Sequence, residues 1–189
     1  MLRSSLVILF LALSASASAE DFDYSFLSIG YGVIDIDDIN VDGDGFNLGA
    51  SYAISDTVHV SGGYQTADLD FGVDVSTFSA GIAYNTSVSP VVDLVARLSY
   101  EYVKLEVPGF PSDDDNGFGL GLGLRFAASD AIELNAGISY VDLSDSGDDT
   151  AFGAAALYNF SDAFALGLSG SWGSDVSVYA LTGRLYFGR

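Results

Sequence analysis

The sequence predicts an all-β fold: a transmembrane, antiparallel, up-and-down β-barrel of about ten strands, with eight strands as the alternative. Three observations predict it. Apolar residues alternate with small or polar ones along most of the chain, an export signal comes first, and no later run suits a transmembrane helix. The clearest stretch is 118–141, FGLGLGLRFAASDAIELNAGISYV, where two alternating runs flank a short polar break. Since strand side chains point alternately to opposite faces, this stretch predicts a hairpin with one apolar face.

An apolar sheet face must be covered, and the other segments repeat the same alternation, so none is left over to cover it. A closed barrel solves this problem, because its apolar face meets lipid and its polar face lines the lumen. The expected strands span residues 23–34, 45–54, 57–67, 73–85, 91–104, 117–127, 131–142, 151–160, 163–173 and 176–187.

Composition agrees with this fold. The 189 residues are 49% hydrophobic and carry a formal charge of −20, as expected when an apolar band is separated from acidic loops. The 22 glycines and 13% aromatic residues suit a small-residue lumen and interfacial rings. Without cysteine, the chain has neither disulfides nor Cys-ligated metal sites.

Residues 1–19 have the features of a cleaved secretory signal peptide. Arg3 supplies the basic start, residues 6–13 form an apolar core too short to span a bilayer, and 17–19 are a small-residue cleavage site. Residues 20–189 are then one barrel domain, in which 5 basic residues face 26 acidic ones for a charge of −21. We expect such an exported chain in the outer membrane of a Gram-negative cell.

Short and long connections are expected to alternate. The short ones are 55–57, 86–90, 128–130 and 161–162, and the longer ones are 35–44, 68–72, 103–116 and 143–150, with a brief 173–175 last. Bacterial barrels place short turns in the periplasm and long loops outside, so we expect both termini in the periplasm.

The expected lipid-facing positions carry no charge, which would cost roughly 2–4 kcal/mol at the bilayer midplane. In the fifth strand they are Val92, Leu94, Ala96, Leu98, Tyr100 and Tyr102. Rings gather at both boundaries: Tyr52, Tyr84, Phe126, Phe160, Phe164 and Phe187 on the periplasmic side, and Tyr31, Phe46, Tyr100, Phe118, Tyr140 and Trp172 outside. Packing of these rings into a soluble core is the alternative interpretation.

Four segments carry a resemblance to a known family: GYGVIDID at 30–37, DGFNLGASYAISD at 44–56, VSGGYQTAD at 60–68 and DLVARLSYEY at 93–102. Through them the chain resembles the small, porin-like outer-membrane β-barrel proteins of Gram-negative bacteria, and is similar to a branch once linked to quorum-type signalling. The resemblance implies a fold and a location, and no catalytic residues. Such barrels usually end on an aromatic residue that the assembly machinery reads, whereas Gly188 and Arg189 follow Phe187 here, a departure that bears on insertion efficiency.

Six charged residues of inward parity form the candidate site: Asp93, Arg97, Glu101, Arg125, Glu133 and Arg184. Simple hairpin register is expected to place Arg97 opposite Arg125, and Arg125 opposite Glu133. An arginine in a narrow lumen needs a carboxylate, because an unpaired buried charge is very costly. We therefore expect an ionic belt across the lower half of the lumen, which either stabilises the interior or constricts a small-solute pore and sets its ion preference.

Small inward residues are expected to leave some room, giving a wet and partly plugged lumen rather than an open one. They are Gly119, Gly121, Gly123, Gly153, Ala155, Gly167, Ser169 and Ser171.

Acidic residues crowd the predicted loops. The first loop holds Asp35, Asp37, Asp38, Asp42 and Asp44, and further aspartates follow in the third and fourth loops. Carboxylates that alternate with glycine at 42–45 could bind Ca²⁺ or Mg²⁺, although no complete EF-hand follows. The alternatives are solvated, self-repelling loops, or divalent cations that bridge the loops to lipopolysaccharide.

No enzyme activity is expected. The single histidine, His59, faces inward at the start of the third strand with no evident triad, so a hydrogen-bonding role in the lumen is favoured. With 6 basic residues in the whole sequence, nucleic acid is not an expected partner, because neutralising phosphates requires clustered Lys and Arg.

The sequence thus favours a monomeric outer-membrane barrel with a structural or porin-like role, including that of a narrow passive channel for small solutes or ions, and without a resident cofactor. An adhesin that acts through its acidic loops is the first alternative, and a soluble secreted ligand-binding barrel is the second. The expected partners are outer-membrane lipid, lipopolysaccharide and the barrel assembly machinery.

Overall fold

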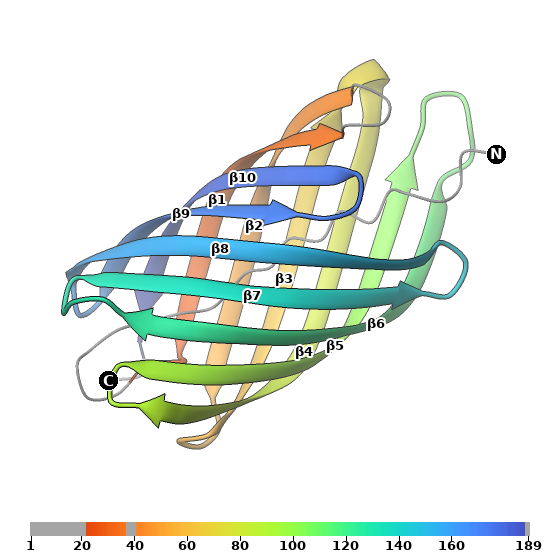
Figure 1. Cartoon of the computed structure of the whole chain (residues 1–189). Coiled ribbons are helices and arrows are strands. Elements are labelled where there is room, and N and C mark those ends of the chain that lie inside the picture. Colours follow the sequence, from red (N-terminus) through yellow and green to blue (C-terminus); the bar gives the residue numbers. More distant parts are fainter. Residues whose placement is uncertain (1–21, 37–40, 188–189) are drawn as a thin grey trace.

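The computed structural model describes residues 22–36 and 41–187, which form ten antiparallel strands closed into one barrel (Figure 1). The strands are β1 (Phe26–Ile36), β2 (Val41–Ala53), β3 (Val58–Leu69), β4 (Val73–Ser89), β5 (Val92–Glu106), β6 (Asp113–Ala127), β7 (Ile132–Leu143), β8 (Gly147–Ser161), β9 (Phe164–Trp172) and β10 (Val176–Tyr186). The predicted ten-stranded up-and-down barrel is confirmed. The predicted signal peptide, 1–19, lies outside the described residues.

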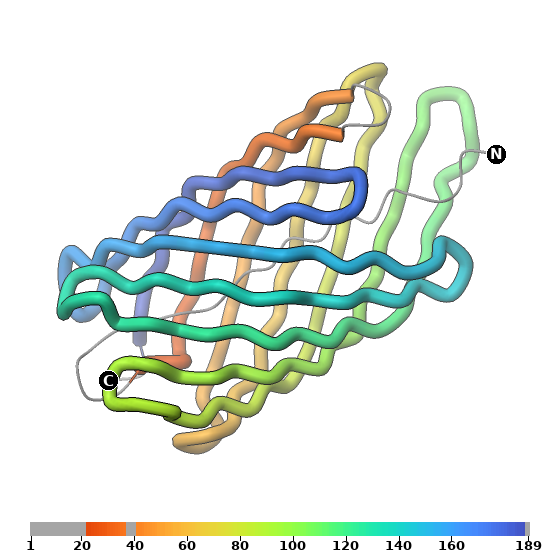
Figure 2. Tube along the Cα trace, in the orientation of Figure 1, coloured from red at the N-terminus to blue at the C-terminus, as the bar shows by residue number. Residues whose placement is uncertain are grey.

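Each strand pairs with its sequence neighbours, and β1 closes the barrel by pairing with β10. That last ladder runs from Phe26 opposite Tyr186 to Ile36 opposite Val176. Closure leaves no sheet edge, so the backbone N–H and C=O groups that hydrocarbon could not solvate are paired within the sheet. Figure 2 shows the strands crossing the barrel obliquely, as closure of a sheet requires.

No helix in the described part of the chain is long and apolar enough to cross a membrane.

The two faces of the sheet follow the predicted parity. Large apolar side chains such as Leu98, Leu120 and Leu122 are exposed on the outside, whereas Arg125 and Asn135 are buried inside. Rings pair at both boundaries of the apolar band: Tyr31 with Phe46 at 5.1 Å and Trp172 with Tyr179 at 6.1 Å at one, Tyr158 with Phe160 at 4.8 Å at the other. We call the stretch of each strand between these two girdles the membrane band.

The connections divide the barrel into two ends. The turn end has the connections 54–57, 90–91, 128–131 and 162–163. The loop end, where Ile36 pairs with Val41, has 70–72, 107–112, 144–146 and 173–175. The predicted long loops are wrong in extent, because strands continue where loops were expected. β5 runs to Glu106, β6 begins at Asp113, and these two strands stay paired as far as Leu105 opposite Asp113.

The alternation inverts where the strands pass the girdle at the loop end. On β1, Ile34 and Ile36 face inward around the outward Asp35, and on β4 Val73 and Val75 flank Asp74 in the same way. β3, β5 and β7 repeat the pattern. An apolar inside with a charged outside is the pattern of a barrel in water. One strand therefore meets hydrocarbon along its membrane band and water beyond it.

Candidate functional site: the barrel lumen

Four of the six predicted site residues gather near the turn end of the lumen. Arg125 and Glu133 are 2% and 0% exposed, and Arg125 Nη2 lies 3.5 Å from Glu133 Oε2. Asn135 Nδ2 donates to the other oxygen of Glu133 at 2.9 Å. Arg184, also buried, is close enough to interact electrostatically with Glu133. These groups satisfy the rule that a buried charge needs an opposite charge and hydrogen bonds.

The segment before β1 completes this layer, which the sequence pattern did not reveal. Tyr24 donates its hydroxyl proton to Asp93 at 2.8 Å, and its ring stacks on His59 at 4.5 Å. The Arg125 guanidinium lies over the rings of Tyr24 at 4.2 Å and Phe22 at 4.6 Å. Cation–π contacts of this kind strengthen when they are shielded from water. Residues 22–25 thus fold into the mouth of the barrel and help to fill it.

The other two predicted residues lie nearer the middle of the lumen and do not join this group. Arg97 Nη2 donates to Ser79 Oγ at 3.3 Å, and Glu101 accepts a hydrogen bond from Ser99 Oγ at 2.5 Å. Within the described part of the chain, no carboxylate oxygen lies within 4.0 Å of the Arg97 guanidinium. The expected belt is therefore not one continuous network.

The register that we expected for these residues is wrong. Arg97 stands opposite Gly121 rather than Arg125, and Arg125 stands opposite Asp93 on one side and Asn135 on the other. The connection between the two strands explains the shift of Arg97: β5 runs on to Glu106 and β6 begins at Asp113, beyond the ends expected at 104 and 117, and the strands pair with Leu105 opposite Asp113. Arg125 still reaches Glu133, because both side chains are long enough to span the offset.

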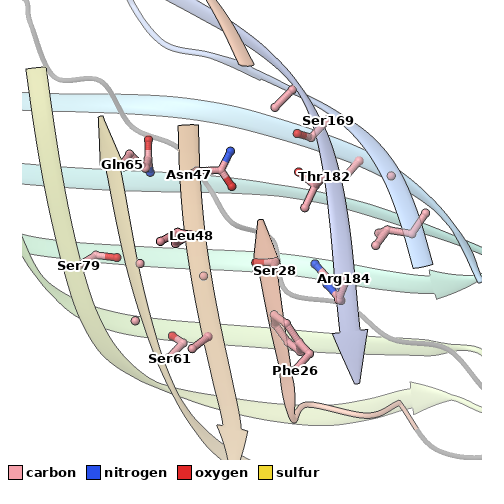
Figure 3. Close-up of a pocket in the computed structure, with 18 of the residues that line it drawn as sticks. Phe26, Ser28, Asn47, Leu48, Ser61, Gln65, Ser79, Ser169, Thr182 and Arg184 are labelled. Carbon is pink, nitrogen blue, oxygen red and sulfur yellow. The ribbon is translucent and has the colours of Figure 1, made fainter. Parts of the chain in front are cut away.

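Between the two ends lies a small polar cavity (Figure 3), which offers about 60 Å³ to the centres of water-sized molecules. In this view Ser28, Ser61, Ser79, Asn47 and Thr182 gather around it together with Arg184. Some predicted small lumen residues, among them Ala155, Gly167 and Ser169, also contribute to its wall. Such a volume is enough for roughly four or five water molecules.

An apolar layer of buried side chains lies inside the barrel at the loop end, and sequence reasoning missed it. Its buried members are Ile34, Ile36, Val41, Ala67, Leu69, Val75, Val176 and Val178, against which Val73, Val103 and Leu105 pack. Val103 also packs on a second buried pair, Val141 and Leu143. The signal was present in short motifs of a charge between two apolar residues, VDV at 73–75 and VDL at 141–143.

The predicted cation ligands of the first loop lie partly in strands. Asp35 belongs to β1 and Asp42 and Asp44 to β2, while Asp37 and Asp38 lie outside the described residues. Asp44 accepts a hydrogen bond from the Tyr31 hydroxyl at 2.8 Å, and the Asp42 amide donates to Asp70 at 3.3 Å. Among the residues that the structure describes, no three His, Cys, Asp or Glu side chains are grouped as a metal site requires.

Outside the girdle, acidic side chains stand in a row across four strands. Asp44 is opposite Asp68, Asp68 opposite Asp74, and Asp74 opposite Glu106. A hydrogen bond with Asp68, partial desolvation and repulsion from Asp68 and Glu106 together raise the pKa of the exposed Asp74 carboxyl. We call these four residues the acidic row. Like charges in direct register destabilise a sheet, and within the row Glu106 pairs with Lys104 at 3.0 Å.

Known structures share this architecture at low identity. An outer membrane channel from Pseudomonas putida F1 is 9% identical, with 95% of this chain and 100% of that chain covered and a TM-score of 0.55. The KdgM porin is 13% identical, with 85% and 99% covered and a TM-score of 0.49. Ail, the attachment invasion locus protein of Yersinia pestis, is 18% identical, with 87% and 97% covered and a TM-score of 0.40. The first of these likenesses shows a common fold, and the other two are too distant to bear on function.

No curated protein matches the chain. A family model described as the outer membrane protein beta-barrel domain matches residues 5–160, which is most of the sequence. The match agrees with the closed ten-stranded barrel, its apolar outer band and its polar lumen. The chain therefore belongs to the family of outer membrane protein beta-barrel domains.

Proposed function

We propose that the protein is an integral outer-membrane barrel with a structural role in the cell envelope, and that its lumen is closed in the conformation described. One observation carries this proposal: side chains fill the lumen at both ends. At the turn end the Arg125–Glu133 pair and residues 22–25 fill it, and at the loop end the apolar layer does. An apolar constriction resists wetting and so blocks ions even where a narrow gap remains.

Planar-bilayer recordings of the refolded mature protein test this role. We expect no steady ohmic current in either potassium chloride or a salt with a larger anion, because both ends are filled. A stable conductance in most insertions would instead support a narrow passive channel. In that case Arg97→Ala should change the ratio of cation to anion permeability.

The orientation is part of the same proposal. Short turns face the periplasm in bacterial barrels, so the turn end would be periplasmic and the loop end would face the medium. The Phe187 amide donates to the Ser25 carbonyl at 3.1 Å beside the turn end. The start of the first strand and the end of the last one would therefore both lie on the periplasmic side. Protease added to intact cells should then cleave at the 107–112 connection and leave the turns at 54–57 intact.

Surface recognition is the second candidate function, and two hairpin tips favour it. Phe71, at a φ of 65°, is 84% exposed, and Phe110, which follows Gly109 at a φ of 83°, is 74% exposed. A bulky residue with positive φ is a backbone outlier that costs of order 1–3 kcal/mol. The tips adjoin, since a Cβ on Gly72 would lie 3.4 Å from Pro108. Exposed aromatic residues are frequent anchors of protein interfaces.

A cell-binding assay tests the recognition role. Bacteria that display the protein would be compared with bacteria that display the Phe71→Ala, Phe110→Ala double variant, on immobilised host-matrix proteins and on cultured cells. We expect a several-fold loss of attachment while the barrel still shows its shift between boiled and unboiled gel samples. Equal attachment by both strains would remove this candidate.

We also propose that Mg²⁺ or Ca²⁺ links the acidic row to phosphate groups of lipopolysaccharide. The row faces outward just beyond the girdle, where lipid headgroups lie, and it has like charges in direct register. We expect a chelator to lower the melting temperature of the protein in lipopolysaccharide vesicles. In the Asp68→Asn, Asp74→Asn variant this drop should be smaller. An equal drop in both proteins would contradict the link.

A further inference from the structure

Among the residues that the structure describes, two arginines and no carboxylate line the cavity in the middle of the lumen. Arg97 contributes to its wall from β5. Arg184 of β10 lies there together with Ser28, Ser79, Asn47 and Thr182 (Figure 3). The remaining predicted site residues, Asp93, Glu101, Arg125 and Glu133, are not part of its wall. The wall therefore combines two guanidinium groups and several hydrogen-bond donors with apolar side chains, and Glu101 and Glu133 interact electrostatically with Arg97 and Arg184 from outside it.

No carboxylate oxygen of the described residues lies within 4.0 Å of the Arg97 guanidinium, and Glu101 interacts with it electrostatically from farther away. Arg97 Nη2 donates to Ser79 Oγ, and the Nε atom of Arg97 is buried without a hydrogen-bond acceptor. The carboxylate on the same strand, Glu101, is engaged by Ser99 Oγ at 2.5 Å. A charged group in a low-dielectric interior is costly unless an opposite charge or several dipoles face it.

We propose that this cavity is a binding site for one small anion, of the size of an acetate, an inorganic phosphate or a halide. Arg97 and Arg184 supply the charge, and the hydroxyl groups of Ser28, Ser79 and Thr182 and the amide of Asn47 supply further donors. The volume open to water centres, about 60 Å³, admits an anion of this size together with little additional water. The site goes beyond the structural role proposed above and does not require an open pore.

A small residue makes room for polar side chains on one side of the cavity. A Cβ on Gly30 would lie 2.6 Å from the Asn47 side chain and 2.8 Å from Thr182 Oγ1. Glycine at position 30 therefore lets both polar side chains stand in the lumen. Both ends of the lumen are filled, so we expect the anion to exchange slowly and to be best introduced while the barrel folds.

Unfolding in urea, after refolding in the presence of the anion, tests the site. Acetate would be compared at constant ionic strength with gluconate, a carboxylate too large for the cavity. A ligand that binds the folded state alone raises its stability in a saturable way. We expect acetate to raise the urea midpoint of the native protein to a plateau, and gluconate to leave it unchanged.

Two variants distinguish acetate binding in the cavity from a general effect of positive charge on stability. Arg97→Gln should abolish the acetate response, whereas Lys104→Gln should keep it, because Lys104 also carries one positive charge on β5 but pairs with Glu106 at 3.0 Å outside the lumen. Crystals of the native protein grown in bromide give a readout that does not depend on any variant folding. An anomalous peak between Arg97 and Arg184 is expected. Water alone in the cavity, or equal responses to acetate and gluconate, would overturn the proposal.

Discussion

At the scale of single residues, the loop end is held by a buried aspartate that the sequence places in a loop. Asp115 lies in β6 and accepts hydrogen bonds from the backbone amides of Asn116, Asp145 and Ser146, at 2.7, 3.0 and 2.8 Å. It thus fastens the 144–146 connection of one hairpin to the strand of another. A carboxylate with several N–H donors is a strong local anchor, because each of these hydrogen bonds is charge-assisted.

The ionised form of Asp115 is the one that the fold stabilises. Burial raises the pKa of this carboxyl, but the hydrogen bonds from Ser146, Asp145 and Asn116 outweigh burial and hold its pKa below the ordinary value. A depressed pKa means that this contribution to stability is present above the unfolded pKa of about 4, and is lost as the pH falls through the lower folded pKa.

Replacing Asp115 by asparagine should therefore loosen the 144–146 connection. We expect the amides of Asp145 and Ser146 to exchange with deuterium roughly threefold to tenfold faster, since a hydrogen bond to a charged group is worth about 1.5–3 kcal/mol before solvent screening. Hydrogen exchange measured at pH 7 checks this. Asp114→Asn removes the same charge from the exposed neighbouring residue and should leave both amides unchanged; equal acceleration in the two variants would argue against the anchor.

At the scale of strands, the solvent changes along each element. β5 shows this most fully: Leu98 and Tyr100 are exposed in the membrane band, while Lys104 and Glu106 occupy the same face beyond the girdle. The inward face changes in the opposite sense, from Arg97 to Val103 and Leu105. A strand of period two can serve both solvents, because each face needs only to match its local surroundings.

The effect of an added charge on the outward face of β5 should then depend on its position along the strand. Within the membrane band the charge should destabilise the fold, and beyond the girdle it should have little effect. Leu98→Arg should lower the free energy of unfolding in phospholipid vesicles by about 2–4 kcal/mol, because the guanidinium would lie in hydrocarbon. Glu106→Arg, on the same strand and face, should change it by less than about 1 kcal/mol, because that position is in water. Urea titrations of both variants check this, and similar losses would contradict the assigned membrane band.

The strand patterns also show how far the sequence could be interpreted. Ten strands, their faces and the rings at their ends followed from alternation alone, since the membrane band imposes a strict period of two. The extensions of β5, β6 and β8 at the loop end did not, because charged residues such as Asp113 and Asp148 resemble loop residues when hydrocarbon is assumed throughout. The lumen residues were found by parity, but their partners depend on register, and a shift of a few residues separated Arg97 from Arg125.

At the scale of the whole molecule, the proposed closed barrel has two closures with a chamber between them. One closure is aromatic and ionic and uses residues 22–25, and the other is the apolar layer around Val103. The closures lie at opposite ends of the barrel, although β5 and β10 contribute side chains to both. Opening one of them alone should leave the path blocked.

A combined variant tests this arrangement. Deleting residues 22–25 alone, or introducing Val103→Ser with Leu105→Ser alone, should give no steady current in planar bilayers. Both changes together should give a small, stable conductance, because water can then enter the chamber from each end. The shift between boiled and unboiled gel samples serves as the control for folding. A current from either change alone would show that the other end is already open.

The change of solvent along the strand underlies both the membrane band and the closed lumen, and spin labels can follow it directly. The chain has no cysteine of its own, so single labels can replace Leu98, Tyr100, Lys104 and Glu106 in turn. Collision rates with oxygen and with a water-soluble nickel complex would be measured in lipid vesicles. The collision rate with oxygen should exceed that with the nickel complex at Leu98→Cys and Tyr100→Cys. The order should be reversed at Lys104→Cys and Glu106→Cys. A higher collision rate with nickel at position 98, or with oxygen as far as position 106, would contradict the account.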